Sequence, residues 1–375
     1  MHIDTKCVHA GGYPDAQTGG INTPIFTSSA YKYLDTDTRL YQRYFNTPNQ
    51  EAVVKKICEL EGAEDGIVFS SGMAAISTVL LSLLKSGDHA VVQDEIYGGS
   101  HAFVEEHLGK LGISFTLTGR EVQEIEKATK TNTKLIYIES PTNPLLNVVD
   151  IRRVAGIGKQ RGILTVIDNT FATPVNQNPF LLGIDVVLHS GTKYLGGHSD
   201  LYCGVAVARK DIAAIIRKTA ANFGGSLNAM SCYMLERSLK TLSIRVERQT
   251  HNALRIARFL EKHHVVSMVN YPGLESHSGY KIASSQMSGF GAMLSFELKD
   301  RTAIDFMRRL RIIKPALSLG GVDTTICDPA TTSHQKVSGD VRKRLGISGN
   351  LLRLSVGIES VEDLIEDIQQ ALEDK

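Results

Sequence analysis

Three polar segments of the 375-residue chain follow short apolar runs and could carry chemistry. Residues 70–73 (SSGM) lie between an apolar run and a helical pattern, and free backbone N–H groups at a helix start bind anions such as phosphate. Asp168 directly follows the apolar run that ends at Ile167, where a buried carboxylate needs a cation or hydrogen-bond donors. Residues 190–193 (SGTK) combine two hydroxyls with the amine of Lys193, which could act as a nucleophile beside a bound anion.

Each segment alone has an ordinary explanation. Serine before a helix is the usual N-cap, Asp168 could cap a loop or hold Mg²⁺, and a single lysine is usually solvated. Residues 190–193 also fit S-x-x-K, the nucleophile motif of penicillin-binding acyltransferases. That alternative requires Ser190 at the start of a helix, and it requires the companion motifs S-D-N and K-T-G, neither of which occurs in the chain.

Together the three segments are more specific. Pyridoxal 5′-phosphate needs an anchor for its phosphate, an acidic partner for its pyridinium nitrogen and an amine for a Schiff base. Gly72, Asp168 and Lys193 supply these three groups in turn. The residues therefore predict this cofactor. No metal site is predicted, because the five cysteines and twelve histidines are dispersed without the spacing of metal ligands.

Longer stretches of the chain resemble the Cys/Met metabolism family of pyridoxal-phosphate enzymes, which includes cystathionine γ-synthase, cystathionine lyases, methionine γ-lyase and O-acylhomoserine sulfhydrylases. The similarity runs nearly from end to end, and the ordered set is far more specific than any one member. The stretches begin at residues 69 (FSSGMAA), 94 (DEIYGGS), 139 (ESPTNP), 167 (IDNTF), 190 (SGTKY), 271 (YPGL), 318 (SLGGV) and 352 (LRLSVG).

The resemblance implies a role for each matching residue around the cofactor. Lys193 would form the Schiff base and then move protons between substrate carbons. Tyr97 would stack on the cofactor ring and assist as an acid or base near the leaving group. The other cofactor-binding residues would be Gly72, Met73, Ser190 and Thr192 at the phosphate, Asp168 at the ring nitrogen and Asn143 near the ring hydroxyl, with Glu139 in support.

The resemblance also implies a substrate site. Arg353 would clamp the substrate α-carboxylate through a bidentate pair, for which a guanidinium suits better than an ammonium, with help from Ser318 and Glu139. Cystathionine enzymes commonly carry an acidic residue just before this Ser-Leu-Gly-Gly motif, where this chain has Leu317. Because an apolar side chain gives a distal ammonium no partner, Leu317 favours methionine, homocysteine or an acylated homoserine.

The first sixty residues, rich in Gly, Ser and Thr before a helical pattern at residues 50–60, are expected to form an extended arm. In the family a Tyr-x-Arg of a neighbouring subunit completes the phosphate site, and Tyr41 and Arg43 match it. Relatives usually read Asn-Pro-Thr a few residues later, where this chain has NTPN at residues 46–49. The resemblance thus implies a homo-oligomer, a homotetramer built as a dimer of dimers.

Between residues 67 and 208, apolar runs alternate with helical patterns. The runs begin near residues 67, 89, 114, 134, 164, 186 and 205 and predict about seven strands, which in such an alternation form a mostly parallel sheet covered on both faces. Ligands of these sheets bind at the carboxyl ends of the strands, where the three polar segments lie. The expected fold is α/β, the fold type I of PLP-dependent transferases, aspartate aminotransferase-like.

The pattern changes after residue 225, where a long helix at 246–264 is followed by strands at 265–270 and 292–298 and helices at 302–310 and 361–372. This pattern predicts a smaller α+β C-terminal domain. We therefore divide the chain into an arm of residues 1–60 that contributes to the neighbouring subunit, a large PLP-binding α/β domain of residues 61–245 and a C-terminal domain of residues 246–375.

Composition excludes several classes of function. Lys plus Arg number 41 and Asp plus Glu 40, for a formal net charge of +1, so a broad affinity for nucleic acid or anionic membrane is not expected. No apolar run is long enough to span a bilayer, and the start of the chain lacks the pattern of a secretory signal. We expect a cytoplasmic enzyme that acts on an amino acid.

These observations predict a PLP-dependent carbon–sulfur lyase of sulfur amino acid metabolism. It would perform α,γ- or α,β-elimination on methionine, homocysteine or cystathionine, and it would release a thiol, ammonia and a 2-oxo acid. The near alternative is γ-replacement, as in cystathionine γ-synthase or O-acylhomoserine sulfhydrylase, in which a thiol captures the same unsaturated intermediate. The S-x-x-K serine acyltransferase is the remote alternative.

Overall fold

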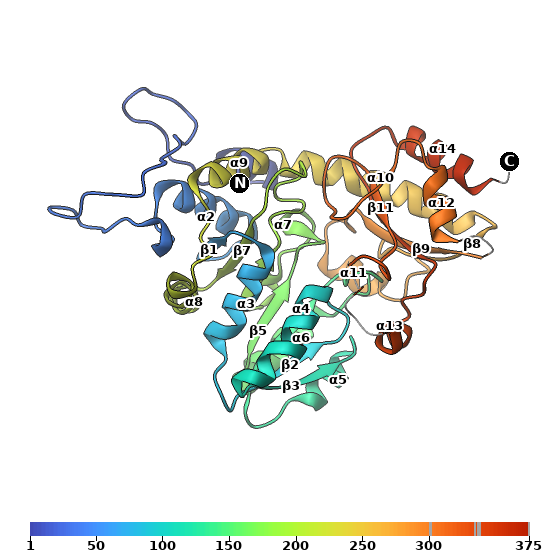
Figure 1. Ribbon diagram of the computed structural model, residues 1–375, viewed down its shortest axis with the longest axis horizontal. Coiled ribbons are helices and arrows are strands. Elements are labelled where there is room, and N and C mark those ends of the chain that lie inside the picture. Colours follow the sequence, from blue (N-terminus) through green and yellow to red (C-terminus); the bar gives the residue numbers. More distant parts are fainter. Residues whose placement is uncertain (300–301, 334, 336–338, 374–375) are drawn as a thin grey trace.

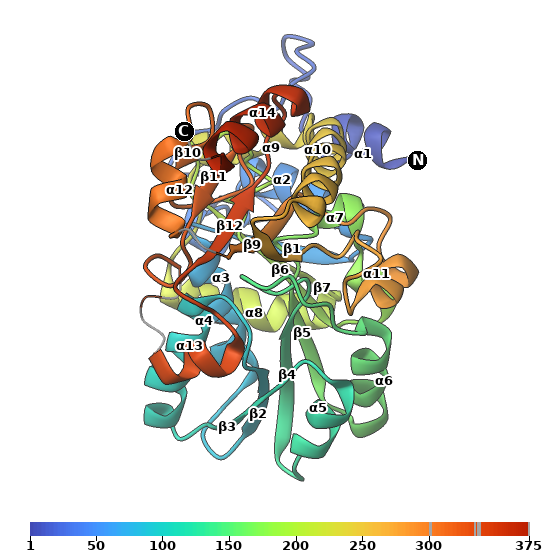
Figure 2. The same ribbon diagram turned by 90° about the vertical axis from the view of Figure 1, so that its right-hand side faces the viewer.

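A computed structural model of the chain describes residues 1–299, 302–333, 335 and 339–373. A seven-stranded sheet, with the order β1-β7-β6-β5-β4-β2-β3, forms its larger part (Figures 1 and 2). β7 is antiparallel to β1 and β6, and the other pairs are parallel. The strands are β1 (Asp65–Phe69), β2 (His89–Gln93), β3 (Ser114–Thr118), β4 (Thr133–Glu139), β5 (Leu164–Asp168), β6 (Val186–His189) and β7 (Gly204–Ala208).

Helices cover both faces of this sheet. Strands such as β2, β6 and β7 are therefore buried along their whole length, as is usual for a mostly parallel sheet. Alternate strand residues belong to two separate apolar cores, with Ile67 in one and Val68 in the other. On the Ile67 face lie α3 (Gly72–Leu83), α4 (Gly98–Phe103) with its continuations η2 (Val104–Leu108) and η3 (Gly109–Leu111), and α8 (Lys210–Phe223). On the Val68 face lie α2 (Pro48–Glu61), α5 (Val122–Ala128) and α6 (Ile151–Arg161).

Local sequence explains how several of these helices begin. Ser71 caps α3 by accepting a hydrogen bond from the backbone N–H of Ala74 at 3.1 Å. Thr47 and Gln50 form a capping box at the start of α2, with Pro48 at the first helical position. The NTPN sequence at residues 46–49 therefore starts a helix.

The N-terminal segment is partly an arm. Residues 3–9 form α1 (Ile3–His9), a helix that the sequence analysis did not predict. Residues 10–41, all of which the structure describes, contain no helix or strand, and much of this stretch extends away from the rest of the molecule (Figure 1). A single turn, η1 (Gln42–Tyr44), then leads into α2.

The C-terminal part contains a second sheet of five strands in the order β10-β11-β12-β9-β8. The long α10 (Leu242–Lys262) runs from the large sheet toward this smaller one (Figure 1). The strands are β8 (Val266–Asn270), β9 (Met293–Leu298), β10 (Lys314–Pro315), β11 (Thr325–Cys327) and β12 (Leu351–Ser355). The remaining helices are α7 (Thr173–Asn176), η4 (Pro179–Leu182), α9 (Ala229–Leu239), α11 (Tyr280–Gln286), α12 (Ala303–Arg309), α13 (Gly339–Leu345) and α14 (Val361–Leu372).

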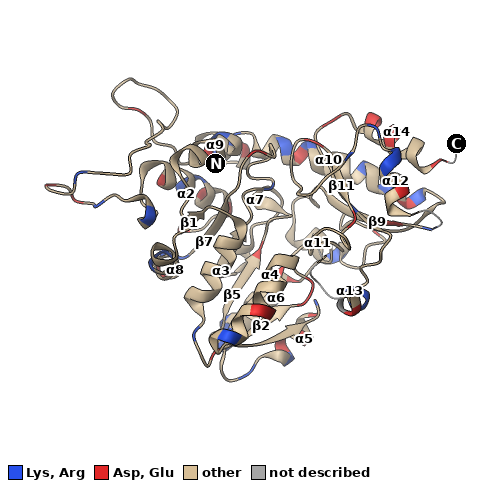
Figure 3. Ribbon diagram, viewed as in Figure 1, with Lys and Arg blue, Asp and Glu red and all other residues tan. Residues whose placement is uncertain are grey.

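The predicted architecture is confirmed: a mostly parallel seven-stranded sheet is joined to a smaller α+β part. Acidic and basic residues are scattered over the ribbon, and segments of both signs occur in the large part and in the C-terminal part (Figure 3). Among the residues described, no helix combines the length and apolarity that a membrane crossing requires. No group of three or more His, Cys, Asp and Glu side chains in the same described ranges could hold a metal ion.

Candidate active site

A cavity of about 510 Å³ lies at the carboxyl ends of the central strands, where the sequence placed the chemistry. Strands β4, β5 and β6 end at it, and β12 of the smaller sheet reaches it from the other side. Nearly all of the residues predicted to bind cofactor or substrate line this cavity. They are Gly72, Met73, Tyr97, Glu139, Asn143, Asp168, Ser190, Thr192, Lys193, Leu317, Ser318 and Arg353.

One end of the cavity is shaped to receive an anion. The Ser71 side chain accepts the Ala74 N–H, which leaves the first N–H groups of α3, at Gly72 and Met73, without partners inside the helix. Gly72 lies so close to Ser190 that an added Cβ would be 2.9 Å from both Cβ and Oγ of that serine. A phosphate at this point would meet free N–H groups, the helix dipole and a hydroxyl together.

Thr192 stands beside this end but has a structural task as well. Its hydroxyl donates to the carbonyl of Cys203 and accepts from the N–H of the same residue, both at 3.1 Å. The segment after β6 is a series of turns rather than the start of a helix. The S-x-x-K alternative required Ser190 to open a helix, and this arrangement does not provide it.

Two carboxyls lie side by side on neighbouring strands, because Glu139 of β4 is paired in register with Asp168 of β5. Burial raises the pKa of Asp168, while hydrogen bonds from Thr170 and the charge of His189 oppose that rise. Burial, followed by the nearby charge of Asp168, raises the pKa of Glu139 well above its usual range. Two adjacent carboxylates cannot both ionise easily. Because the pKa of Glu139 is raised well above its usual range, Asp168 is the carboxylate that would pair with a pyridinium nitrogen.

Glu139 also positions the segment that carries Tyr97. Its Oε2 accepts the backbone N–H of Tyr97 at 2.8 Å, so this carboxyl fixes the start of α4. The Tyr97 side chain is 40% exposed and borders the cavity. A Cβ at position 99 would be 2.5 Å from the Tyr97 ring, so the ring can occupy its position because residue 99 is a glycine.

Lys193 is the amine of the site. Its Nζ donates to the hydroxyl of Ser318 at 2.8 Å. Desolvation, with the positive charge of Arg353 as a second cause, lowers the pKa of Lys193 to about 8. A substantial part of this amine is therefore unprotonated near neutral pH, as a nucleophile or a base requires.

Arg353 is buried on β12 and faces the cavity from the smaller sheet. Its Nη1 donates to Asn143 Oδ1 at 2.8 Å, and its Nη2 lies 3.5 Å from the carbonyl oxygen of Ser318. The sequence analysis placed Asn143 at the cofactor ring, but it did not foresee this bond to Arg353. A guanidinium held in this way offers a fixed fork to a substrate carboxylate.

Tyr41 and Arg43 do not line the cavity of their own chain. Arg43 donates to the carbonyl of Ala221 at 2.5 Å, and its guanidinium lies 5.6 Å from the ring centres of Tyr41 and Tyr44. The cavity also has lining residues that the sequence analysis missed, among them Thr170, Phe171 and Tyr202. Thr170 could have been found, because it lies within the IDNTF stretch and its hydroxyl accepts the N–H of Ser190.

The cavity fits pyridoxal 5′-phosphate on the observations above: a close-approach glycine at a helix start, a buried carboxylate and a desolvated amine. Comparison with known proteins points the same way. The family described as Cys/Met metabolism PLP-dependent enzymes matches residues 4–373.

Individual relatives match over essentially their full length. The cystathionine beta-lyase of Lactococcus lactis subsp. cremoris (strain MG1363) is 43% identical, with 100% of this chain and 99% of the relative covered. The cystathionine gamma-lyase of Bacillus subtilis (strain 168) is also 43% identical, with 100% of both chains covered. The crystal structure of cystathionine gamma-lyase from Lactobacillus plantarum complexed with L-serine has a TM-score of 0.96 and 37% identity, covering 99% of this chain and 98% of that one.

Proposed function

This chain belongs to the family of Cys/Met metabolism PLP-dependent enzymes, and we propose that it is a carbon–sulfur lyase that cleaves sulfur amino acids into a thiol, ammonia and a 2-oxo acid. One observation carries the proposal. The desolvated amine of Lys193, the buried carboxylate of Asp168 and the buried guanidinium of Arg353 all face one cavity.

The residues divide the work of elimination between them. When bound, pyridoxal 5′-phosphate supplies the electron sink that stabilises negative charge at the substrate α-carbon. Arg353, fixed by Asn143, holds the substrate carboxylate, so the α-proton can be presented to Nζ of Lys193. That nitrogen can remove the proton at neutral pH because its pKa is about 8. Tyr97 also lines the cavity, and its hydroxyl would protonate the departing sulfur.

Substrate choice would depend on Leu317, a residue that lines the cavity and is 68% exposed. An apolar residue offers no charge partner to a distal ammonium group, so the leaving side of the substrate would be recognised by shape and apolar contact. We therefore propose that methionine and homocysteine are accepted together with cystathionine, the substrate that the names of the relatives indicate.

The product acid reveals which bond is broken. Cleavage of cystathionine at Cβ–S gives pyruvate and homocysteine, whereas cleavage at Cγ–S gives 2-oxobutyrate and cysteine. The test is to incubate the PLP-loaded enzyme with cystathionine and to identify the acid and the thiol by chromatography. Lys193→Ala is the matched control. The proposal fails if neither acid forms, or if this variant forms it at the parent rate.

We further propose that the active unit is at least a dimer, in which the arm of residues 10–41 and the turn that carries Arg43 reach the neighbouring subunit, while α1 and α2 pack in the core of their own chain. Tyr41 and Arg43 lie outside their own cavity, and the arm of residues 10–41 extends from the body (Figure 1). An Arg43→Ala chain and a Lys193→Ala chain would then complement each other, because a mixed dimer contains one site with both residues intact. Recovery of activity after the two inactive variants are unfolded and refolded together supports this arrangement, and no recovery contradicts it.

A further inference from the structure

The orientation of Arg353 depends on a loop of residues 142–147 that follows β4. This loop carries Asn143, whose Oδ1 accepts a hydrogen bond from Nη1 of Arg353 at 2.8 Å. The contacts of the guanidinium with Ser318 and Ser333 are longer, both 3.5 Å. The direction in which the guanidinium points is therefore set mainly by Asn143, and through Asn143 by the loop.

Glu95, in the segment between β2 and α4, holds this loop together. Its Oε1 accepts the hydroxyl of Thr142 at 2.6 Å and Nδ2 of Asn147 at 3.0 Å. Its Oε2 accepts the same Nδ2 at 2.7 Å. The hydroxyl of Thr142 also accepts the backbone N–H of Asn147 at 3.0 Å. One carboxyl group thus joins the first residue of the loop to the last.

The loop needs support from outside because its own backbone is strained. Leu146 has a φ of 58°, in the left-handed region that a bulky side chain rarely adopts, and such a conformation persists only where the surroundings hold it. Glu95 gives this support from a buried position, since it is 8% exposed and does not line the cavity. Burial raises the pKa of Glu95, while hydrogen bonds from Thr142 and Asn147 and the charge of Arg120 oppose that rise.

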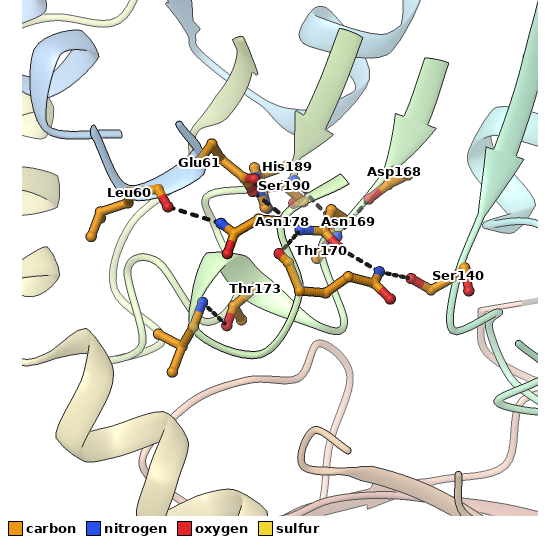
Figure 4. Close-up of polar contacts among 12 residues, drawn as sticks. Leu60, Glu61, Ser140, Asp168, Asn169, Thr170, Thr173, Asn178, His189 and Ser190 are labelled. Atoms are coloured by element: carbon orange, nitrogen blue, oxygen red, sulfur yellow. Dashed lines mark hydrogen bonds and ion pairs between the residues drawn. The ribbon is translucent and has the colours of Figure 1, made fainter. Parts of the chain in front are cut away.

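Other contacts hold the residues that precede the loop. The carbonyl of Ser140 accepts a hydrogen bond from Nε2 of Gln177 at 2.9 Å (Figure 4). Glu139, at the end of β4, is paired in register with Asp168 and accepts the N–H of Tyr97. A change at Glu95 should therefore disturb the loop that carries Asn143 and leave the two carboxyls at the ends of β4 and β5 in place.

We propose that Glu95 is a positioning residue of the substrate site: its carboxyl group fixes the loop of residues 142–147, so that Asn143 aims the guanidinium of Arg353 at the substrate α-carboxylate. The inference rests on the proposed function, because it requires Arg353 to bind that carboxylate. It does not depend on which carbon–sulfur bond is cleaved.

Glu95→Gln tests the proposal because the new amide keeps the size of the carboxyl group but brings in a hydrogen-bond donor. Both oxygens of Glu95 face Nδ2 of Asn147, so an NH₂ group in either position meets another donor. Asn147 cannot turn its side-chain amide around to accept this NH₂ group, because its Oδ1 already accepts a hydrogen bond from Nη1 of Arg120. In this variant the loop must move away from residue 95.

The test compares two ligands that differ only in the carboxylate. Dissociation constants are measured on the PLP-loaded enzyme, from the absorbance of the bound cofactor, for L-norleucine and for pentylamine. Norleucine is methionine with a methylene in place of the sulfur, and pentylamine is norleucine without its carboxylate. The parent should prefer norleucine. Glu95→Gln should reduce this preference about tenfold, as for the loss of one hydrogen bond to a charged group, and should bind pentylamine within about twofold of the parent value.

Two further variants separate positioning from general damage. When Glu95→Gln is combined with Asn147→Asp, the new amide can donate to the new carboxylate, which can still accept from Arg120, so the preference for norleucine should return. Asp185→Asn is the matched control. Asp185 accepts the N–H and the hydroxyl of Thr165, both at 2.9 Å, at the amino ends of β5 and β6. Its neutralisation should lower the thermal stability and leave the preference unchanged.

The proposal is overturned if Glu95→Gln keeps the preference of the parent, if it weakens both ligands equally, or if the double variant does not recover. If Glu95→Gln does not fold, Thr142→Val removes the hydroxyl that donates to Glu95. It should reduce the preference in the same way, and an unchanged preference overturns the proposal. Neither ligand has a leaving group, so failure of the proposed lyase activity would not produce these results. A parent that binds both ligands alike would instead refute the clamp at Arg353, and the proposal with it.

Discussion

The unusual acidity of the Lys193 ammonium is the feature of the site that can be measured most sharply. Burial and the charge of Arg353 lower its pKa to about 8, against about 10.4 for a free lysine side chain. At pH 7.5 roughly a quarter of Lys193 would be unprotonated, compared with roughly one part in a thousand for a free lysine, a ratio of about 200. The apoprotein should therefore present one amine that titrates far below ordinary lysines.

The assay is competitive labelling of the apoprotein with an amine reagent between pH 6 and 10.5, with the extent at each lysine read by peptide mass spectrometry. The rate at Lys193 should rise with pH and level off above about pH 8.5. Arg353→Gln removes the second cause of the shift, so the midpoint should move upward, yet it should stay below 10.4 because burial is the larger cause. Labelling of the exposed Lys110 should be the same in both proteins.

The reference compound is Nα-acetyl-lysine, whose ε-amine is free and whose labelling rate keeps rising beyond pH 10. A rate at Lys193 that rises in the same way would refute the reasoning. A midpoint that does not move in Arg353→Gln would refute the part assigned to that guanidinium. Thermal unfolding of the variant shows whether the comparison is made between folded proteins.

Three further predictions concern cofactor and substrate. Asp168→Asn should weaken binding of pyridoxal 5′-phosphate about 10- to 150-fold, since a hydrogen bond to a charged group contributes about 1.5–3 kcal/mol. The loss is measured by equilibrium binding to the apoprotein. A variant that binds with the affinity of the parent would contradict this prediction. Gly72→Ala places a Cβ 2.9 Å from Ser190 Oγ. The variant should lose about tenfold in affinity for pyridoxal 5′-phosphate but should bind pyridoxal, which lacks the phosphate, like the parent. An equal loss of affinity for both ligands would contradict the phosphate site at Gly72. Leu317→Glu gives the distal ammonium of cystathionine a charge partner, so it should raise kcat/KM for cystathionine relative to methionine. The gain should not exceed about fivefold, because exposed ion pairs contribute about 0.2–1 kcal/mol. An unchanged ratio would mean that the distal ammonium does not lie near residue 317.

The sequence was informative where local pattern decides structure. Buried strands with helices between them predicted the large sheet, and the residues at the carboxyl ends of β5 and β6 predicted the position of Asp168 and Lys193. These predictions follow from alternation of elements and from the geometry of parallel sheets. They require no knowledge of which distant segments meet.

Features that depend on distant segments could not be predicted in this way. β12 was missed because Arg353 interrupts its apolar run, so the substrate clamp was assigned only through the resemblance. The contact between Glu95 and Asn147 joins residues 52 positions apart, and no local pattern indicates that Glu95 is buried. α8 (Lys210–Phe223) and α1 (Ile3–His9) were also missed.

The most direct test of the central claim is to measure substrate consumption and 2-oxo acid release together, with methionine, cystathionine, cysteine and O-acetylhomoserine, each with and without an added thiol. A carbon–sulfur lyase should consume a sulfur amino acid without added thiol and release one 2-oxo acid and one ammonia for each molecule consumed. Consumption that requires the added thiol and yields a new thioether without oxo acid would contradict this function and identify γ-replacement in its place.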